Sequence, residues 1–134
     1  MPKIKQINHV AIVVEDMEKS LGFWRDALGL ELHELRDVPA EASQVAFLPV
    51  AGCEIELVKP TSDDSGIAKY LSKRGPSMHH VCLEVDDIDE MMATLKAKGV
   101  SLINETARVA ADGKKYAFIH PKSTGGVLVE LYQL

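Results

Sequence analysis

The sequence has few cysteines, no long apolar run and no apolar N-terminal segment. Only two of the 134 residues are cysteine, Cys53 and Cys82, and they form no CxxC pair. Two such thiols exclude a zinc site built of thiolates alone and predict no disulfide framework. No apolar run approaches the roughly 18–20 residues that span a bilayer, and the N-terminus lacks the apolar stretch of a signal peptide. We therefore expect a cytoplasmic protein with no membrane partner.

Positive charge is also scarce. The chain has 15 Lys and Arg residues against 20 Asp and Glu residues, for a formal net charge of −5. A general nucleic-acid binder needs a clustered basic surface that neutralises phosphates, so we expect no nucleic-acid partner. Hydrophobic residues make up 46% and charged residues 26%, which is ordinary for a globular protein. The length allows one compact domain, or two small modules that share a core.

The most informative feature that is present is an internal repeat. Residues 9–18 match residues 80–89 at a constant offset of 71, beginning with His-Val in both copies. The same offset relates residues 46–48 to 117–119, and an offset of 74 relates 55–57 to 129–131. Three extra residues in the last loop explain the larger offset. We predict one domain over residues 1–134, with modules at about 5–60 and 77–134 joined by a linker at 61–76.

Each module has the pattern of a strand, a helix and three further strands. The helices are predicted between Asp16 and Gly29 and between Asp87 and Gly99, where an aspartate can cap the start and a glycine the end. The predicted fold class is α+β: two repeated βαβββ modules form one curved, mostly antiparallel sheet with a concave metal-binding cleft and helices outside. The predicted strands are 7–14, 30–37, 44–50 and 53–59, then 100–104, 115–120 and 127–132, with a short helix at 67–73 in the linker.

The repeat places four metal-ligand residue types at equivalent positions. His9 and His80 lie on the first strand of each module, and Glu56 and Glu130 lie on the last. Strands related by a two-fold axis would bring these four side chains together, with room for two further oxygen ligands. Such a donor set suits a five- or six-coordinate divalent ion such as Co, Ni, Mn, Fe, Mg or Zn. It does not suit closed tetrahedral zinc or blue copper.

A purely structural interpretation of the same residues is also available. A lone histidine near the start of a strand is more often a satisfied polar residue than a ligand. Both residue types recur in both modules, however, and duplicated ligands must keep their lone pairs. Glu54 shares a strand face with Glu56, so alternation alone does not choose between them. His79 would point to the face opposite its neighbour's, and His33 and His120 have no partner in the repeat.

These motifs resemble the vicinal oxygen chelate superfamily, which includes glyoxalase I, ring-cleavage dioxygenases and bleomycin-resistance proteins. Within that superfamily the chain is most similar to the methylmalonyl-CoA epimerase family. The His-His pair at 79–80 and the final stretch are the most specific parts of the resemblance. The segments that carry it cover nearly the whole chain: residues 8–11, 45–49, 54–57, 64–71, 78–81 and 120–131.

The resemblance implies an enzyme that interconverts (2R)- and (2S)-methylmalonyl-CoA. The carbon between the thioester and the carboxylate loses its proton and regains one on the opposite face. The implied cofactor is a divalent metal ion (Co, Ni, Mn, Zn or Mg) that stabilises the enolate-like oxyanion as a Lewis acid. The implied partners are an acyl-CoA substrate and a second copy of the chain in a homodimer.

The resemblance also implies roles for particular residues. The final-strand glutamate of the family, here Glu130, is a metal ligand and one of two proposed bases. The other base is a glutamate near the start of the third predicted strand. Glu41 is the nearest carboxylate, and Gln44 is the alternative in another register, although a glutamine cannot act as a base. Lys122 and Ser123 could hold the substrate carboxylate or the CoA phosphates, or lie in a solvated loop.

Three other functions fit part of the pattern. Glyoxalase I has the same kind of metal site and also moves a proton beside a carbonyl, but acts on a glutathione hemithioacetal; the linker and residues 120–123 favour the epimerase. A ring-cleavage dioxygenase uses two histidines and one carboxylate around Fe(II), so the additional Glu56 counts against it. A metal-free binding or resistance protein needs none of the four ligand residues, and their retention argues against that function.

Overall fold

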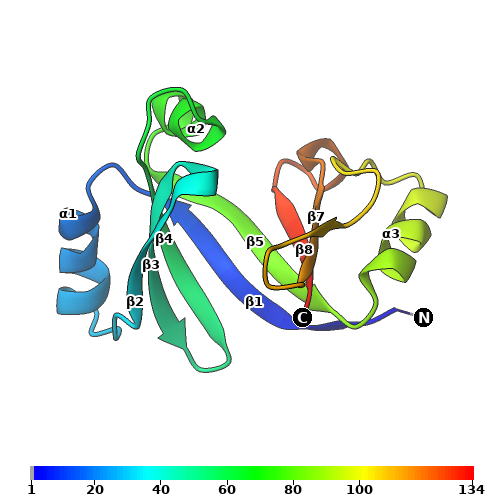
Figure 1. Cartoon of the computed structure of the whole chain (residues 1–134), viewed down its shortest axis with the longest axis horizontal. Helices are drawn as coiled ribbons and strands as arrows, with labels where there is room; N and C mark the ends of the chain where they lie inside the picture. Colours follow the sequence, from blue (N-terminus) through cyan, green and yellow to red (C-terminus); the bar gives the residue numbers. More distant parts are fainter. Residues whose placement is uncertain (1) are drawn as a thin grey trace. The chain divides into compact units, whose positions relative to one another are not determined.

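The computed structural model describes residues 2–134 and has the α+β fold that the sequence predicts (Figure 1). Within this range the order strand, helix and three strands occurs twice, as the repeat requires. The elements are β1 (Ile4–Val13), α1 (Met17–Leu21), η1 (Gly22–Ala27), β2 (Glu34–Val38), η2 (Pro39–Glu41), β3 (Ser43–Val50), β4 (Cys53–Pro60), α2 (Gly66–Arg74), β5 (Ser77–Val85), α3 (Ile88–Ala97), β6 (Arg108–Val109), β7 (Lys115–Ile119), η3 (Pro121–Ser123) and β8 (Val129–Gln133).

The chain forms two compact units whose boundaries fall inside strands. Unit 1 contains the N-terminal residues up to His9 together with His80–Leu134, and unit 2 contains Val10–His79. Strands β1 and β5 therefore each contribute to both units. As a result, His9 and His80 belong to the same unit as the C-terminal strand β8.

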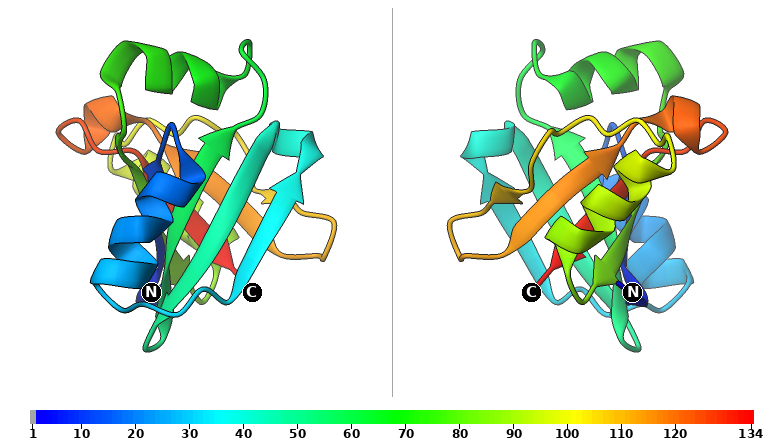
Figure 2. Two further views of the ribbon diagram at one scale, coloured as in Figure 1. Left: turned by 90° about the vertical axis from the view of Figure 1, so that its left-hand side faces the viewer. Right: turned by 90° about the vertical axis from the view of Figure 1, so that its right-hand side faces the viewer.

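In unit 1 the strand order is β1-β5-β8-β7-β6. Strands β5 and β8 are parallel, and Cys82 lies opposite Glu130 in their register. Strand β7 pairs antiparallel with β8 and with β6. Helix α3 packs along β8, and the core between them includes Ile88 and Leu131, which are 0% and 2% exposed (Figure 2). Burial of such apolar side chains is the main force that holds the helix on the sheet.

In unit 2 the strand order is β2-β3-β4-β1, with antiparallel pairing of β2 with β3 and of β3 with β4. Helix α1 packs on β4, and Leu21, Leu48 and Leu57 are fully buried in the core between them (Figure 2). The backbone N–H of Val14 donates to Val58 at 2.9 Å, which ties the end of β1 to β4.

The predicted strand at 100–104 forms only a single bridge, between Leu102 and Ile119. The side-chain oxygen of Asn104 accepts a hydrogen bond from the backbone N–H of Phe118 at 2.8 Å. The side-chain oxygen of Asn104 takes the place of a backbone carbonyl, so the hydrogen-bond ladder between this segment and β7 is interrupted. A two-residue strand, β6, restores pairing with β7 further along the chain.

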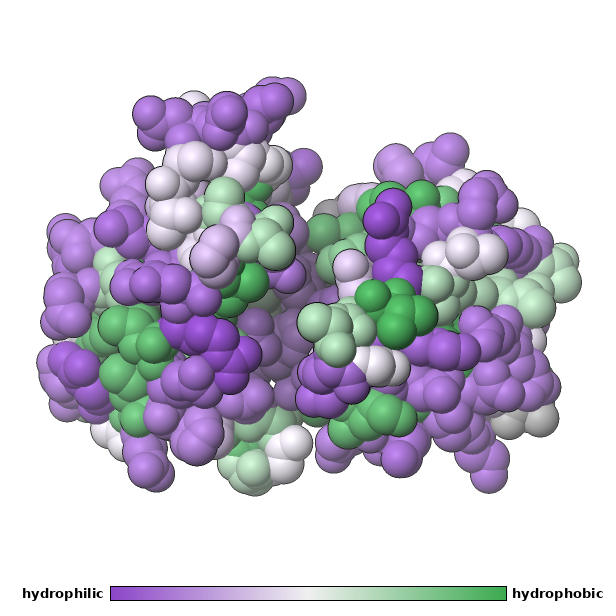
Figure 3. All heavy atoms as spheres, in the orientation of Figure 1, coloured by the Kyte–Doolittle hydropathy of each residue, from purple (hydrophilic) through white to green (hydrophobic). Residues whose placement is uncertain are grey.

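Helix α2 lies in the predicted linker and none of its residues is buried. Hydrophilic side chains cover it in the space-filling view, in keeping with its exposed Lys69, Lys73 and Arg74 (Figure 3). Over residues 2–134, no helix combines the length and the apolar character needed to cross a membrane.

Asp87 caps α3 as the sequence predicts, because its Oδ1 accepts a hydrogen bond from the backbone N–H of Glu90 at 3.0 Å. Replacing Asp87 with alanine should lower the free energy of unfolding by about 1 kcal/mol, since the N–H loses its acceptor. Urea unfolding followed by circular dichroism measures the change. Asp87→Ser keeps a capping oxygen and should stay within a few tenths of a kcal/mol of the parent. Equal loss in both variants would contradict the capping role.

Candidate metal centre

Three of the four predicted ligands meet in unit 1. Nε2 of His9 lies 3.1 Å from Nε2 of His80 and 3.3 Å from Oε1 of Glu130, and His80 Nε2 lies 3.1 Å from the same Oε1. The three side chains come from the neighbouring strands β1, β5 and β8. His9 is 8% exposed and Glu130 is 9% exposed, so the cluster is largely shielded from water.

Strand geometry explains why these side chains share one face of the sheet. Cys82 lies opposite Glu130 in the parallel pairing of β5 with β8. His80 precedes Cys82 by two residues, and side chains two apart on a strand point the same way. Phe118 on β7 is also paired with Glu130, and its ring meets that of His80 edge-on at a centroid distance of 5.8 Å. The aromatic ring therefore packs against one side of the cluster.

The donor separations fit a divalent ion. Two ligands at right angles on a metal with bonds of about 2.1 Å lie about 3.0 Å apart, which is the edge of an octahedron. The three separations in the cluster, from 3.1 to 3.3 Å, are close to that length. Two imidazole nitrogens and one carboxylate oxygen form a donor set that Co, Ni, Mn, Fe and Zn all accept. The residues present are thus compatible with the ion that the sequence predicts.

The pKa of Glu130 reflects two opposing influences. Burial of the carboxyl group raises its pKa, whereas the close contacts of the carboxylate with the imidazoles of His80 and His9 lower it. The second influence is larger in sum and brings the pKa from 4.5 to about 2. Glu130 is therefore ionised at neutral pH, and an ionised carboxylate offers only lone pairs to its neighbours.

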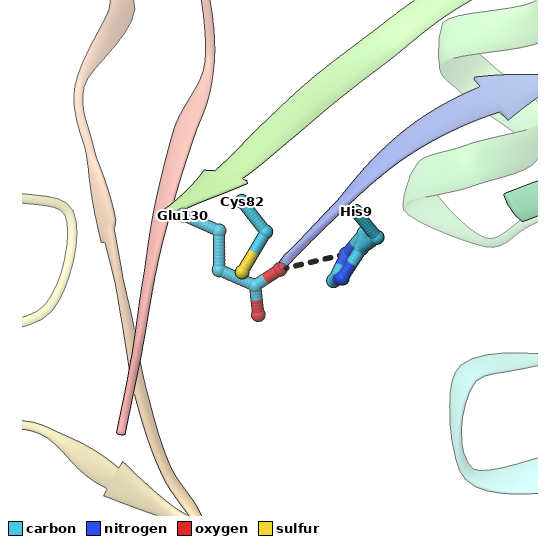
Figure 4. Close-up of side chains that lie close together, drawn as sticks. All are labelled: His9, Cys82 and Glu130. Carbon is cyan, nitrogen blue, oxygen red and sulfur yellow. Dashed lines mark ion pairs between the residues drawn. The ribbon is translucent and has the colours of Figure 1, made fainter. Parts of the chain in front are cut away.

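Cys82 is a potential ligand that the sequence analysis missed. Its thiol, an imidazole nitrogen of His9 and a carboxylate oxygen of Glu130 all lie within 4.8 Å of one another (Figure 4). Cys82 is fully buried, so its sulfur faces this cluster and not the solvent. The signal in the sequence is its spacing of two residues from His80, which places both side chains on one face of β5.

Glu56, the fourth predicted ligand, lies on β4 in unit 2. It is paired with Phe47 on β3, and opposite residues of an antiparallel pair share a face. The guanidinium of Arg36 lies 4.7 Å from the centre of the Phe47 ring. Glu54 is two residues away on the same face, so the structure leaves both carboxylates on that side of the strand. Metal ligation by Glu56 stays a prediction.

The two candidates for the second base differ in their strand position. Glu41 is exposed at the end of η2, and its backbone carbonyl accepts a hydrogen bond from the Ser43 hydroxyl. Gln44 lies on β3, where alternation places it on the same face as Ala46 and Leu48. Those two residues form the core under α1, which is the face opposite that of Phe47. The assignment of Glu41 as the second base stays a prediction.

Lys122 and Ser123 lie in η3 of unit 1. Nδ1 of His120 accepts a hydrogen bond from the backbone N–H of Lys122 and so caps this turn. The hydroxyl of Ser123 accepts a hydrogen bond from the backbone N–H of Ser101 at 2.9 Å. Ser123 therefore has a structural partner, while the side chain of Lys122 is exposed. Contact of either residue with a substrate stays a prediction.

Comparison with known proteins gives consistent matches. Residues 8–118 match the model of the glyoxalase/bleomycin resistance protein/dioxygenase superfamily. The chain is 41% identical over 132 residues to the mitochondrial methylmalonyl-CoA epimerase of Mus musculus, covering 98% of this chain and 74% of that protein. It is 26% identical over 125 residues to a lactoylglutathione lyase of Arabidopsis thaliana, covering 93% of this chain and 43% of that protein.

Solved structures give the same result. The methylmalonyl-CoA epimerase of Mycobacterium tuberculosis is 36% identical, with a TM-score of 0.85 over 97% of this chain and 88% of that one. A methylmalonyl-CoA epimerase in complex with methylmalonyl-CoA and NH4+ is 28% identical, with a TM-score of 0.86 over 98% of this chain and 95% of that one.

Proposed function

Because this chain belongs to the glyoxalase/bleomycin resistance protein/dioxygenase superfamily, we propose that it is an epimerase interconverting (2R)- and (2S)-methylmalonyl-CoA. The similarity to methylmalonyl-CoA epimerases extends over nearly the whole chain in sequence and in structure. The observation that carries the proposal in this molecule is the convergence of His9, His80 and Glu130 at separations of 3.1–3.3 Å.

We propose that His9, His80 and Glu130 hold a divalent metal ion, with Glu56 as the predicted fourth ligand. Co, Ni, Mn, Zn and Mg are the candidate ions, and the nitrogen donors favour the transition metals among them. When bound, such an ion supplies a Lewis acid for the oxyanion that forms on the thioester carbonyl. We further propose that residues 1–134 form a single domain and that the protein acts as a homodimer on an acyl-CoA substrate. The predicted location is the cytoplasm.

The two proposed bases act on opposite faces of the substrate's carbon 2. Glu130 takes the proton on one face, and Glu41 is the predicted donor and acceptor on the other. A carboxylate with a pKa of about 2 is a weak base, so Glu130 can take the proton only from a strongly acidified carbon. The low pKa suits metal ligation better than proton abstraction. The main role that we propose for Glu130 is therefore to bind and orient the metal ion, and proton abstraction is its second role.

The exchange of hydrogen at carbon 2 tests the proposed function. Metal-loaded protein incubated with methylmalonyl-CoA in D2O should replace the carbon 2 proton by deuterium, because inversion requires that proton to leave and return. Proton NMR of the methyl group follows the exchange, as its doublet collapses. The same incubation with the Glu130→Gln protein should show only the background rate.

Glyoxalase chemistry predicts a different result in the same assay. No exchange with methylmalonyl-CoA, together with turnover of a glutathione hemithioacetal, would overturn the epimerase proposal and favour lactoylglutathione lyase activity.

A further inference from the structure

A buried carboxylate that the proposed mechanism does not use lies beside β1 in unit 1. Glu84 on β5 is 4% exposed. Its Oε1 accepts hydrogen bonds from Gln6 Nε2 at 3.2 Å and from Asn8 Nδ2 at 3.4 Å. Its Oε2 lies 3.5 Å from the ammonium group of Lys5. All three donors come from the strand that carries His9, so Glu84 acts only as an acceptor toward that strand.

Asn8 connects this carboxylate to His9. Its amide nitrogen faces Glu84, and its Oδ1 lies 2.8 Å from Nδ1 of His9. Oε1 of Glu84 accepts the hydrogen bond from Asn8 Nδ2, so the amide turns its NH2 group toward Glu84 and its oxygen toward His9. The amide oxygen offers no hydrogen, and therefore Nδ1 of His9 must carry one. The lone pair of a neutral imidazole is then on Nε2, the atom that faces His80 and Glu130. In the metal-free protein, a hydrogen on Nε2 of His80, which lies 3.1 Å from His9 Nε2 and 3.1 Å from Glu130 Oε1, is the donor between these two acceptors.

We propose that Glu84 and Asn8 are positioning residues that set the tautomer of His9 through the orientation of one amide group. The tautomer they impose is the one that presents a lone pair to a metal ion. The role of this tautomer in metal binding rests on the proposed metal centre. The assignment of the hydrogen to Nδ1 does not depend on a metal ion. Hydrogen bonds of this kind to ligating histidines orient the ring and raise its affinity for metal.

The opposite orientation of Asn8 has a definite cost. Its NH2 group would face Nδ1 of His9, and the ring hydrogen would move to Nε2, where it would face the Glu130 carboxylate. The lone pair would then be on Nδ1 and would point away from the cluster. The Asn8 oxygen would then face the Glu84 carboxylate, and two acceptors would oppose each other. Removal of the acceptor at position 84 removes that penalty and frees the amide to turn.

Two substitutions at one position separate this role from packing. Glu84→Gln keeps an oxygen that can accept from Asn8 and Gln6, and its NH2 group replaces Oε2 beside Lys5, whose side chain is 58% exposed. Glu84→Leu keeps a similar volume but has no acceptor. Glu105→Gln is the matched control, because it removes the same charge in unit 1 from a side chain that is 96% exposed.

The experiment measures two quantities on each protein. Long-range proton–nitrogen NMR of metal-free protein, at a pH where imidazole is neutral, reports which ring nitrogen of His9 carries hydrogen. Titration with Co²⁺ reports metal affinity. We expect Nδ1–H in the parent, in Glu84→Gln and in Glu105→Gln, with Co²⁺ affinities within about threefold of one another. Glu84→Leu should move part of His9 to the Nε2–H form and weaken Co²⁺ binding about 10- to 100-fold.

The outcomes distinguish this inference from the proposed metal centre. An Nε2–H ring in the parent protein would overturn the inference, as would a Glu84→Leu protein with parental tautomer and Co²⁺ affinity. A parent that shows Nδ1–H but binds no Co²⁺ would refute the metal centre and leave the tautomer assignment standing. If Glu84→Leu does not fold, Asn8→Leu replaces it with the same expected mixture of tautomers, and an unchanged ring there counts against the inference.

Discussion

Replacing Glu130 with glutamine is expected to reduce kcat by about a thousandfold or more and to lower metal content sharply. The amide has nearly the same shape as the carboxylate, but it has no charge and cannot hold the abstracted proton. Glu130 lies 3.3 Å from His9 and 3.1 Å from His80, so its charge is central to the donor set. Steady-state epimerisation and metal analysis of the purified variant measure the two effects.

The comparison of activity with metal content separates the two roles of Glu130. Loss of both indicates a ligand, and loss of activity with metal retained indicates a base. Glu105→Gln makes the same chemical change at an exposed position and should behave as the parent. A Glu130→Gln protein with full activity would refute both roles.

Removal of the metal ion is the second change with a large expected effect. Exhaustive dialysis against a chelator should reduce turnover by about a thousandfold, because the oxyanion loses its Lewis acid. Addition of Co²⁺ should restore it. The buried setting of His9 and Glu130, at 8% and 9% exposure, predicts slow release of the ion and a need for long incubation. The rate of epimerisation before and after dialysis measures the effect.

The His80→Ala protein provides the control for that experiment. It lacks one of the three converging donors, so Co²⁺ at the concentration that restores the parent should not restore it. Chelated protein that keeps its full activity would refute the metal mechanism.

The sequence predicted the helices and strands that the repeat defines. It did not predict structural details that depend on local hydrogen bonding. Periodicity predicted one helix from Asp16 to Gly29, but the structure ends α1 at Leu21 and continues as the π-helix η1. The N–H of Leu28 donates to Phe23, five residues earlier. Apolar spacing determines which side of a helix is buried and does not distinguish this bonding from an α-helix.

The candidate site shows the same division. His9, His80 and Glu130 lie close together on the neighbouring strands β1, β5 and β8, as the repeat predicts for His9 and His80, and their binding of a metal ion stays a prediction. The buried thiol of Cys82 was missed, since the matching residue in the first module is Ala11 and the repeat gives no signal there. The link from His9 through Asn8 to Glu84 depends on side-chain orientation, which periodicity does not determine.

The separation of His9 and His80 in the chain gives the proposed metal ion a second physical consequence. These residues are 71 positions apart, yet their ring nitrogens lie 3.1 Å apart. An ion bound to both closes a long loop, as a cross-link does, and restricts the unfolded chain wherever it stays attached. Both cysteines of this protein are free thiols. The metal ion would thus act as a reversible cross-link. Metal loading would then govern the stability of the folded chain against unfolding as well as its turnover of substrate.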